Sequence, residues 1–292
     1  MFNGAHKKAM LLILCYCLIA IPEPSVAENP EDDILYMGIF PRRSATETVK
    51  MFTPMAEYLS QQLQRDVRLV TARNFNTFWK ALSKGKFHLV HYNQYHYIRS
   101  HREYGHRAIL INEEFNSATI AGAIMVRKDS GFNMLSDLRG KKVVFGGGPK
   151  AMQSFIIATH LLRQAGLKEG DYEFEFTKNP INAIFAPYFH QADAGGVGDK
   201  IFTLRAITRR IDSSKMKFLA IGEQLPHLPW AVNSMVSNDL ASRIQEILAN
   251  MEKTEQGRKI LQRAELTDLR IAKDSDFNRH REITLEVLDE SY

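Results

Sequence analysis

The chain has 292 residues, of which 45% are apolar and 24% are charged, and its formal net charge is +5. This composition is that of a globular protein with room for about two domains, and it excludes a disordered, fibrous or polytopic membrane protein. The modest charge and the lack of a long Lys/Arg run argue against a nucleic-acid-binding protein and only weakly favour anionic ligands.

The first 27 residues have the pattern of a secretory signal peptide. Two lysines precede the apolar run Ala9–Ile21, and Ser25-Val26-Ala27 supplies small residues for cleavage. The alternative is an uncleaved anchor, although the run is shorter than the roughly 20 residues that a membrane span needs. Both cysteines, Cys15 and Cys17, lie in this run. We therefore expect a periplasmic protein without cysteine chemistry.

Two stretches after this segment predict the same order of elements, strand-helix-strand-helix-strand. In the first, apolar runs and helical spacing predict Ile34–Phe40, Thr46–Gln62, Val67–Thr71, Asn76–Ser83 and Phe87–Tyr92. In the second, the order is Val143–Phe145, Ala151–Ala165, Tyr172–Phe176, Ile181–His190 and Ala192–Val197. Because alternating strands and helices predict parallel strands covered by helices, two such units predict two α/β lobes.

Extended segments are expected to cross between the lobes, namely Ser117–Val126, Lys217–Ile221 and Trp230–Val236. We expect residues 28–120 to form the first lobe and residues 121–224 the second. Residues 225–292 would return through the hinge and add helices that pack mainly on the first lobe, including Leu240–Met251. Since ligands of open α/β sheets bind at the carboxyl ends of strands, the cleft between the lobes is the predicted site.

The strongest local signal for a ligand is the glycine-rich turn that joins a strand to a helix at residues 146–150. Glycines let the backbone approach a ligand closely, and a helix start offers free N–H groups. The pattern predicts an oxyanion site with Gly148, Lys150, Ala151, Met152 and Ser154 as candidates. The bland alternative is a structural turn with an exposed lysine. The turn lacks Walker A spacing, and its relaxed match to G-x-G-x-x-A is too weak to predict a dinucleotide site.

A second signal is the aromatic and polar segment that follows the third predicted strand. Its candidate ligand contacts are Tyr92, Asn93, Tyr95, His96 and Tyr97. The alternative is the start of an amphipathic helix whose tyrosines pack inward. A metal site made by the nearby histidines is disfavoured, because steps of five residues along a helix turn successive side chains by about 140°.

Further candidates follow other predicted strands. Arg42, like its neighbour Arg43, is placed to clamp an anion, although such arginines are more often solvated. Asn179 and Asn182 follow the second strand of the second lobe, where Asn179 has the alternative role of a helix cap. Asp199 ends the last strand of that lobe and would meet a cationic part of a ligand.

Signatures of catalysis are missing from the sequence. It contains no H-E-x-x-H or G-x-S-x-G motif, and no carboxylate pair stands out from the charged background. We therefore expect reversible binding rather than turnover, with no cofactor and no metal. The competing hypotheses are a periplasmic enzyme and an interaction module with a closed cleft.

The chain resembles the periplasmic phosphate/phosphite/phosphonate-binding proteins of ABC importers. The resemblance lies in Gly38–Pro41, Phe52–Leu59, Ile124–Gly131, Leu135–Lys141 and Leu228–Trp230, and it covers nearly all of the chain after residue 27. It implies a two-lobed type II periplasmic-binding-protein fold, with a mixed sheet flanked by helices in each lobe. It also implies that Tyr97 takes the place of a ligand-binding tyrosine of the family.

The sequence departs from the family at two binding segments. Lys150, Ala151 and Met152 stand where the family has a Ser-Thr-Ser run that supplies hydroxyls, and Pro180-Ile181-Asn182 stands where it has Ser-His-Asp. The resemblance implies a monomer that captures a small anionic, phosphonate- or phosphate-like solute by hinge closure and delivers it to an ABC permease. The alternative is a receptor that feeds a membrane sensor kinase.

Overall fold

The protein is described by a computed structural model of residues 34–177 and 182–292, together with Met1. The rest of the predicted signal peptide and Asn179 lie outside the described residues. Within the described part of the chain, no helix is long and apolar enough to cross a membrane.

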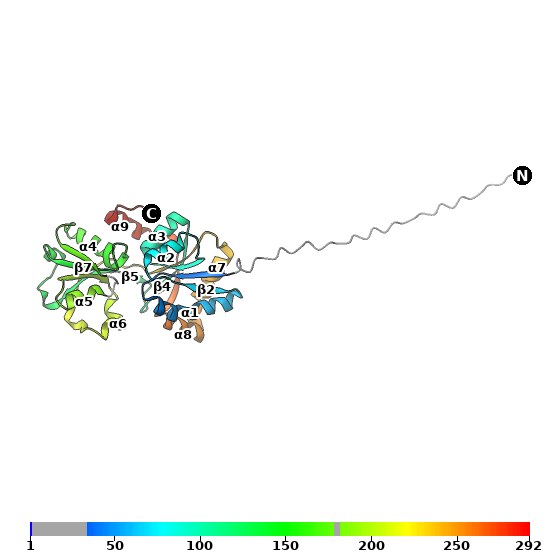
Figure 1. Ribbon diagram of the computed structural model, residues 1–292, viewed down its shortest axis with the longest axis horizontal. Coiled ribbons are helices and arrows are strands. Elements are labelled where there is room, and N and C mark those ends of the chain that lie inside the picture. Colours follow the sequence, from blue (N-terminus) through cyan, green and yellow to red (C-terminus); the bar gives the residue numbers. More distant parts are fainter. Residues whose placement is uncertain (2–33, 178–181) are drawn as a thin grey trace. The chain divides into compact units, whose positions relative to one another are not determined.

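Two mixed sheets organise the fold (Figure 1). The first sheet has six strands in the order β13-β4-β12-β3-β1-β2, with bounds Asp268–Ile271, Arg107–Glu113, Pro229–Val232, Leu89–His91, Leu35–Ile39 and Val67–Val70. The second has five in the order β10-β6-β9-β7-β8, with bounds Met216–Ile221, Gly122–Arg127, Ala194–Gly198, Lys142–Gly146 and Glu173–Thr177. Strands β1 to β3 and β7 to β9 are parallel, and the others add antiparallel pairs. The predicted α/β lobes with mixed sheets are confirmed.

Helices cover both faces of each sheet. On the first sheet, one face packs against α1 (Ala45–Leu63), α7 (Asn238–Ala249) and α8 (Glu255–Arg263). The other face packs against α2 (Phe75–Leu82), α3 (Gln94–Tyr104) and α9 (Asn278–Leu288). The second sheet lies between α5 (Asn182–Tyr188) and α6 (Arg205–Thr208) on one side and α4 (Ala158–Gln164) on the other. A π-helical segment, η3 (Met152–Ile157), leads directly into α4.

Of the three predicted crossing segments, Ser117–Val126 contains a connection between the two large sheets, and the other two do not. The crossing strands are β5 (Thr119–Ile120) and β11 (Leu225–Pro226), which pair antiparallel in a small separate sheet. Lys217–Ile221 instead forms most of the edge strand β10, and Trp230 lies in β12 of the first sheet. Trp230 is fully buried and donates its indole N–H to Asn112 Oδ1 at 2.8 Å, so it belongs to the core.

The loop that ends β1 is fixed by the helix that follows it. The Ser44 side chain accepts a hydrogen bond from the Glu47 N–H at 3.2 Å and caps α1. Met51, Met55 and Leu59 recur at helical spacing and are buried in the core of the first lobe. The two arginines that precede the cap are therefore held at a defined place at the carboxyl end of β1.

The second sheet and η3 approach each other at a glycine. A Cβ at Gly196 of β9 would lie 2.2 Å from the Ser154 carbonyl oxygen and 2.5 Å from Phe145 Cδ1. Only a residue without a side chain lets the start of η3 pack this closely on the sheet.

We expect Gly196→Ala to lower the free energy of unfolding by about 2 kcal/mol, because η3 must move away from the sheet. Urea unfolding of the wild type and the variant measures the difference. The matched control is Gly198→Ala on the same strand, where the added Cβ would meet Ile120 Cδ1, the end of a flexible side chain, at 3.4 Å. Equal losses in the two variants would contradict the close approach at Gly196.

Six histidines are buried in the described structure, and burial shifts the pKa of five of them. Burial lowers the pKa of His91, His96 and His280 to about 3 and the pKa of His106 and His227 to about 4. The His280 ring has no hydrogen-bond partner among the described residues, and it is fully buried. These rings are therefore neutral in the folded protein at pH 7.

The free energy of unfolding should fall as the pH is lowered from 7 to 5. The unfolded chain takes up protons near pH 6.5 while the folded chain does not until about pH 4, so each neutral buried histidine costs about 2 kcal/mol at pH 5. Thermal unfolding should show a fall in Tm of more than about 5 °C between these pH values.

Two leucine variants provide the control for this pH dependence. His280→Leu removes an unpartnered ring and should raise Tm, more strongly at pH 5 than at pH 7. His160→Leu should lower Tm, because the His160 Nδ1 lies 2.9 Å from Glu286 Oε1 and that contact is lost. A His280→Leu variant with an unchanged pH profile would show that this ring does not contribute.

Candidate functional site

A cavity of about 270 Å³ is lined by residues of both lobes. Its charged lining residues are Arg42, Arg43 and Glu114 from the first lobe and Lys200 from the second. Its uncharged polar residues are Asn93, Gln94, Gln153 and Ser154, and its apolar wall includes Phe40, Phe75, Met152, Ile201 and Leu228. A largely apolar cavity with a few polar groups is typical of small-molecule sites.

On the first-lobe side, a buried ion pair dominates the electrostatics of the cavity. Arg42 Nη1 lies 2.8 Å from Glu114 Oε1, and the Asn112 amide donates to the same oxygen at 3.0 Å. Burial alone would raise the pKa of Glu114, but Arg42 and these hydrogen bonds hold it at about 2. Glu114 is therefore ionised, and it in turn raises the pKa of Arg42 against the effect of burial.

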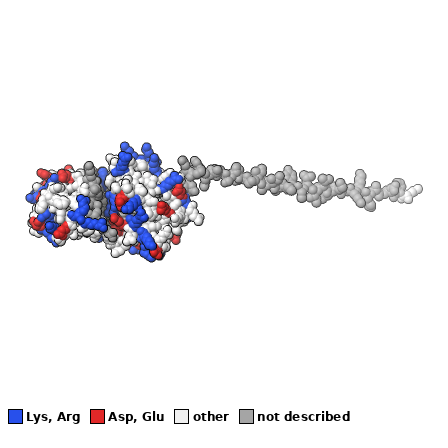
Figure 2. Space-filling view, turned by 60° about the horizontal axis from the view of Figure 1, so that its bottom comes forward, with Lys and Arg blue, Asp and Glu red and all other residues white. Residues whose placement is uncertain are grey.

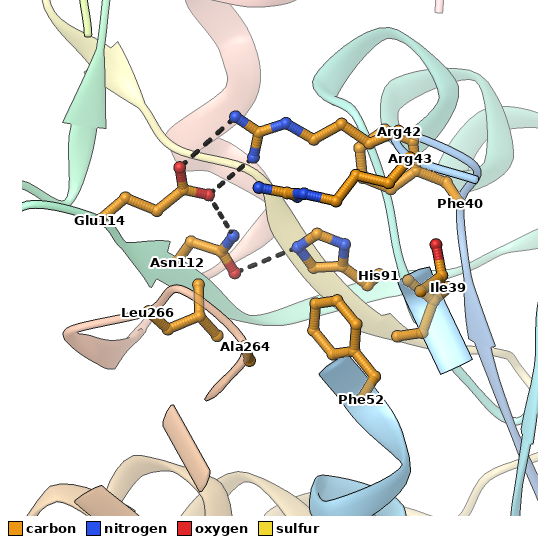
Figure 3. Close-up of a pocket in the computed structure, with 11 residues that line it drawn as sticks. Ile39, Phe40, Arg42, Arg43, Phe52, His91, Asn112, Glu114, Ala264 and Leu266 are labelled. Carbon is orange, nitrogen blue, oxygen red and sulfur yellow. Dashed lines mark hydrogen bonds and ion pairs between the residues drawn. The ribbon is translucent and has the colours of Figure 1, made fainter. Parts of the chain in front are cut away.

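The guanidinium group of Arg43 lies beside that of Arg42 (Figure 3). Arg43 pairs with Glu265, and burial together with the neighbouring Arg42 lowers the pKa of Arg43. Beneath the two arginines, a pocket of about 10 Å³ is bordered by His91 and Asn112, which is room for about one water molecule. The larger cavity thus meets two adjacent cations, only one of which has a deeply buried carboxylate partner.

On the second-lobe side, the backbone supplies the polar groups. Gly147 and Gly148 adopt φ values of +83° and +95°, a region that glycine enters without strain, and they turn the chain from β7 towards η3. Residues 151–154 then line the cavity. The first N–H groups of a helix have no acceptor within that helix, so the start of η3 offers donors for an anion. The Ser154 hydroxyl donates to the Gly146 carbonyl.

Five of the candidates from the sequence line the cavity, namely Arg42, Asn93, Ala151, Met152 and Ser154. Asn93 also caps α3 by accepting from the His96 N–H at 2.8 Å, and it donates from Nδ2 to the Lys150 carbonyl at 3.1 Å. Asn93 therefore joins the first lobe to the second at the edge of the cavity.

The tyrosines and His96 lie outside the cavity lining, so the structure does not bring them together with the candidates that line it. Tyr92 is buried with its hydroxyl 2.7 Å from His106 Nδ1, and Tyr97 donates to Asp274 Oδ1 at 2.7 Å. Tyr95 donates to Glu290 Oε2 at 2.7 Å, and the His96 ring stacks on Phe75. The segment is the start of helix α3 with its tyrosines packed inward, which is the alternative that the sequence left open.

Gly148 and Lys150 border the cavity without lining it. The Lys150 ammonium pairs with Glu290 and lies 4.7 Å from the centre of the Tyr95 ring. The Lys150 side chain is therefore paired with the C-terminal tail in this structure, and its role as an anion-binding cation stays a prediction.

The remaining candidates are not among the residues that line the cavity. Asp199 accepts from the Ala121 N–H at 3.1 Å and from Gln224 Nε2 at 2.8 Å, so it links the crossing segments, and its contact with a ligand stays a prediction. Asn182 is exposed at the start of α5. The candidate contacts drawn from the sequence did not include the cavity residues Gln94, Glu114, Gln153 and Lys200. Gln94 lies within the aromatic and polar segment and Gln153 within the predicted helix start, whereas Glu114 and Lys200 stand in no motif.

Metal ligation finds no support in the described residues, where no group of three or more His, Cys, Asp or Glu side chains is arranged to hold an ion. On the face of the molecule drawn in Figure 2, basic and acidic side chains are interspersed over both lobes.

Comparison with known proteins shows the family of the chain. The profile described as "ABC transporter, phosphonate, periplasmic substrate-binding protein" matches residues 37–277. Among curated proteins, the chain is 28% identical over 160 residues to the tetrathionate sensor histidine kinase TtrS of Salmonella typhimurium. This match covers 51% of the chain and 26% of the kinase, so the chain corresponds to about a quarter of that protein.

Solved structures share the fold at low sequence identity. The methylphosphonate complex of PhnD1 from Prochlorococcus marinus superposes with a TM-score of 0.76 at 16% identity, covering 90% of this chain and 100% of that one. XAC2383 from Xanthomonas citri bound to ATP superposes with a TM-score of 0.75 at 14% identity, covering 88% of this chain and 98% of that one. A binding-protein component of an ABC phosphonate transporter from Pseudomonas aeruginosa gives 0.73 at 12% identity, covering 87% and 86%. The predicted two-lobed type II fold is confirmed.

Glu114→Gln should lower the free energy of unfolding by about 2 kcal/mol at pH 7. The substitution keeps an oxygen for the Asn112 amide but leaves the half-buried Arg42 without a charged partner. Urea unfolding measures the loss. The matched control is Glu265→Gln, which removes an exposed partner of Arg43 and should cost less than about 0.5 kcal/mol. Equal effects would show that Glu114 is not the structural partner described above.

Proposed function

Because the chain belongs to the periplasmic substrate-binding proteins of ABC phosphonate transporters, we propose that it captures a small oxyanion between its two lobes and presents it to an ABC permease. The family and the fold are those of binding proteins, and the proposed activity is reversible capture without turnover. The periplasm is the compartment in which such a family acts.

The observation that carries the proposal is the composition of the two cavity walls. Arg42 and Arg43 supply guanidinium groups from the first lobe, and residues 151–154 supply the start of a helix from the second. Guanidinium groups bind oxyanions with paired hydrogen bonds, and helix N–H groups bind them without a side chain. An oxyanion held between the two walls would satisfy donors of both lobes at once.

This arrangement also suits the departures from the family at the helix start. Lys150, Ala151 and Met152 offer no hydroxyl, so the second lobe would contribute chiefly backbone N–H groups. The arginines of the first lobe would then supply most of the attraction for the anion. The PhnD1 structure holds methylphosphonate, and SsuA from Escherichia coli, which shares the fold, is an aliphatic sulphonate binding protein, so both classes are suitable probes.

Closure would follow from contacts that exist only when the lobes are together. A ligand shifts a conformational equilibrium only by its differential affinity for the two states. An anion that touches Arg43 in the first lobe and residues 151–154 in the second would favour the closed form. The short crossing strands β5 and β11 are the natural place for the bend.

A second candidate function is that of a ligand receptor for a sensor kinase. The observation that favours it is the match to TtrS, whose name couples tetrathionate to a histidine kinase. The same cavity would then bind an oxyanion, but the closed form would be read by a kinase instead of a permease.

The direct test is ligand-induced stabilisation of residues 28–292. The panel contains phosphate, phosphite, methylphosphonate, methanesulfonate, sulfate and tetrathionate, with arginine as a cationic comparison. A ligand at 100 times its Kd adds about 2.7 kcal/mol to the stability of the folded state, which raises Tm by several degrees. Stabilisation by arginine alone, or by no compound, would refute the oxyanion proposal.

Arg43→Ala should weaken binding of the stabilising anion at least about tenfold in titration calorimetry, because a charge-assisted contact is lost. The matched control is Arg68→Ala, which removes an exposed arginine of β2 that pairs with Asp66 and should leave the affinity unchanged. Deletion of the gene separates the two readers of the closed form. Loss of uptake of the anion indicates a permease, whereas normal uptake with loss of anion-dependent transcription indicates a kinase.

A further inference from the structure

Two glutamines face the cavity from opposite lobes. Gln94 begins α3 in the first lobe, and Gln153 lies in the first turn of η3 in the second. Gln94 is completely buried and Gln153 is half-buried. Three of their four amide atoms have no hydrogen-bond partner among residues 34–177 and 182–292, namely Gln94 Oε1, Gln153 Oε1 and Gln153 Nε2.

The amide of Gln94 is fixed in one orientation. Its Nε2 donates to the Pro226 carbonyl of β11 at 3.1 Å. A carbonyl oxygen only accepts, so the nitrogen must face Pro226 and the oxygen must face away from it. Gln94 Oε1 is therefore an acceptor that cannot become a donor by a flip of the amide.

The amide of Gln153 is not fixed in this way. Both of its polar atoms lack partners in the described structure, so either orientation is open to it. It can donate to a ligand oxygen or accept from a ligand proton. Gln153 is thus an adaptable contact, whereas Gln94 has a defined requirement.

A buried acceptor without a donor is unfavourable relative to the same group with its hydrogen bond made. The Glu114 carboxylate lines the same cavity and is another acceptor-only group. The cavity therefore combines cations with acceptors. Glu114 already accepts from Arg42 and Asn112, so a bare anion would leave Gln94 Oε1 as the acceptor without a donor.

We propose that the oxyanion bound here carries a hydrogen-bond donor, and that Gln94 Oε1 accepts the hydrogen bond from it. This proposal rests on the oxyanion function proposed above. The ligand class is then an acid that keeps an O–H group, such as a hydrogen phosphonate, or an anion with a hydroxyl substituent. Fully ionised sulfonates and thionates without a hydroxyl group are the class that Gln94 rejects.

Three small anions distinguish the cases in titration calorimetry with the wild-type chain at pH 6. Methylphosphonate keeps an acidic O–H, methanesulfonate has none, and 2-hydroxyethanesulfonate has only an alcohol O–H. We expect methylphosphonate, 2-hydroxyethanesulfonate or both to bind at least about tenfold more tightly than methanesulfonate, one hydrogen bond being worth about that factor. Preference for the first assigns the donor to the acid group, and preference for the second assigns it to the substituent.

Equal affinity for all three anions, or tighter binding of methanesulfonate, would overturn this proposal while leaving the oxyanion function intact. Binding of none of these anions and of no other oxyanion in the panel would overturn both.

Gln94→Met tests the residue itself. The variant removes the acceptor at similar volume, and it should reduce the preference for the O–H-bearing anion over methanesulfonate by about tenfold. The matched control is Gln153→Met, the same chemical change at the other amide, which should change the ratio of the two affinities less than Gln94→Met does, because the Gln153 amide can turn to donate to either anion. Circular dichroism and Tm show whether Gln94→Met is folded. If it is not, the comparison of the three anions on the wild-type chain still decides the proposal.

Discussion

The pair between Arg42 and Glu114 is the interaction on which the site depends. Arg42 stands in the loop after β1, and Glu114 directly follows β4, where the chain leaves the first sheet for the crossing strand β5. The pair ties the cation-bearing loop to the beginning of the hinge. His227, just after the second crossing strand, places Nε2 3.8 Å from Glu114 Oε2. The buried Glu114 carboxylate thus pairs with Arg42 of the cavity, lies at the start of the first crossing segment and contacts His227 after the second.

In the cavity that we propose for an oxyanion, the positive charges are already paired with carboxylates. Arg42 is largely neutralised by Glu114, Arg43 is offset by Glu265 at the surface, and Lys200 pairs with Asp199 at 3.1 Å. A cavity in which every cation already has a partner would hold a divalent anion less strongly than a site with free cations would. Its discrimination between ligands then depends more on hydrogen-bond donors and acceptors, which is the property that Gln94 and Gln153 would supply.

The sequence predicted the fold well because the signals of the fold are local. Apolar runs and helical spacing defined the alternating elements of both lobes, and the glycine-rich turn at residues 146–148 correctly predicted a helix start beside the cavity. The tyrosines after β3 were predicted as ligand contacts, and the structure packs them inside the first lobe. Polar tips on Tyr92 and Tyr97 look like ligand contacts, but His106 and Asp274, which are distant in sequence, satisfy them inside the lobe.

Other site residues could not be predicted because their roles arise only in three dimensions. Glu114 is an ordinary residue at the end of a strand until the fold brings it to Arg42. The orientation of the Gln94 amide is fixed by the hydrogen bond from its Nε2 to the Pro226 carbonyl, a contact between residues far apart in the chain. Lys150 shows the same limit, since a lysine after a glycine-rich turn favours anion binding, and its pairing with Glu290 of the C-terminal tail arises only in the fold.

The C-terminal segment restricts how the proposed closure can proceed. Helix α9 packs against α3 of the first lobe and against η3 and α4 of the second (Figure 1). Arg163 of α4 donates to the Val287 carbonyl at 3.1 Å, and Glu290 joins Lys150 of the second lobe to Tyr95 of the first. The proposed opening of the lobes would have to break these contacts or turn about them. Arg43 and Lys200 line the cavity from opposite lobes. The proposed motion of the lobes would therefore change the distance between these two cations.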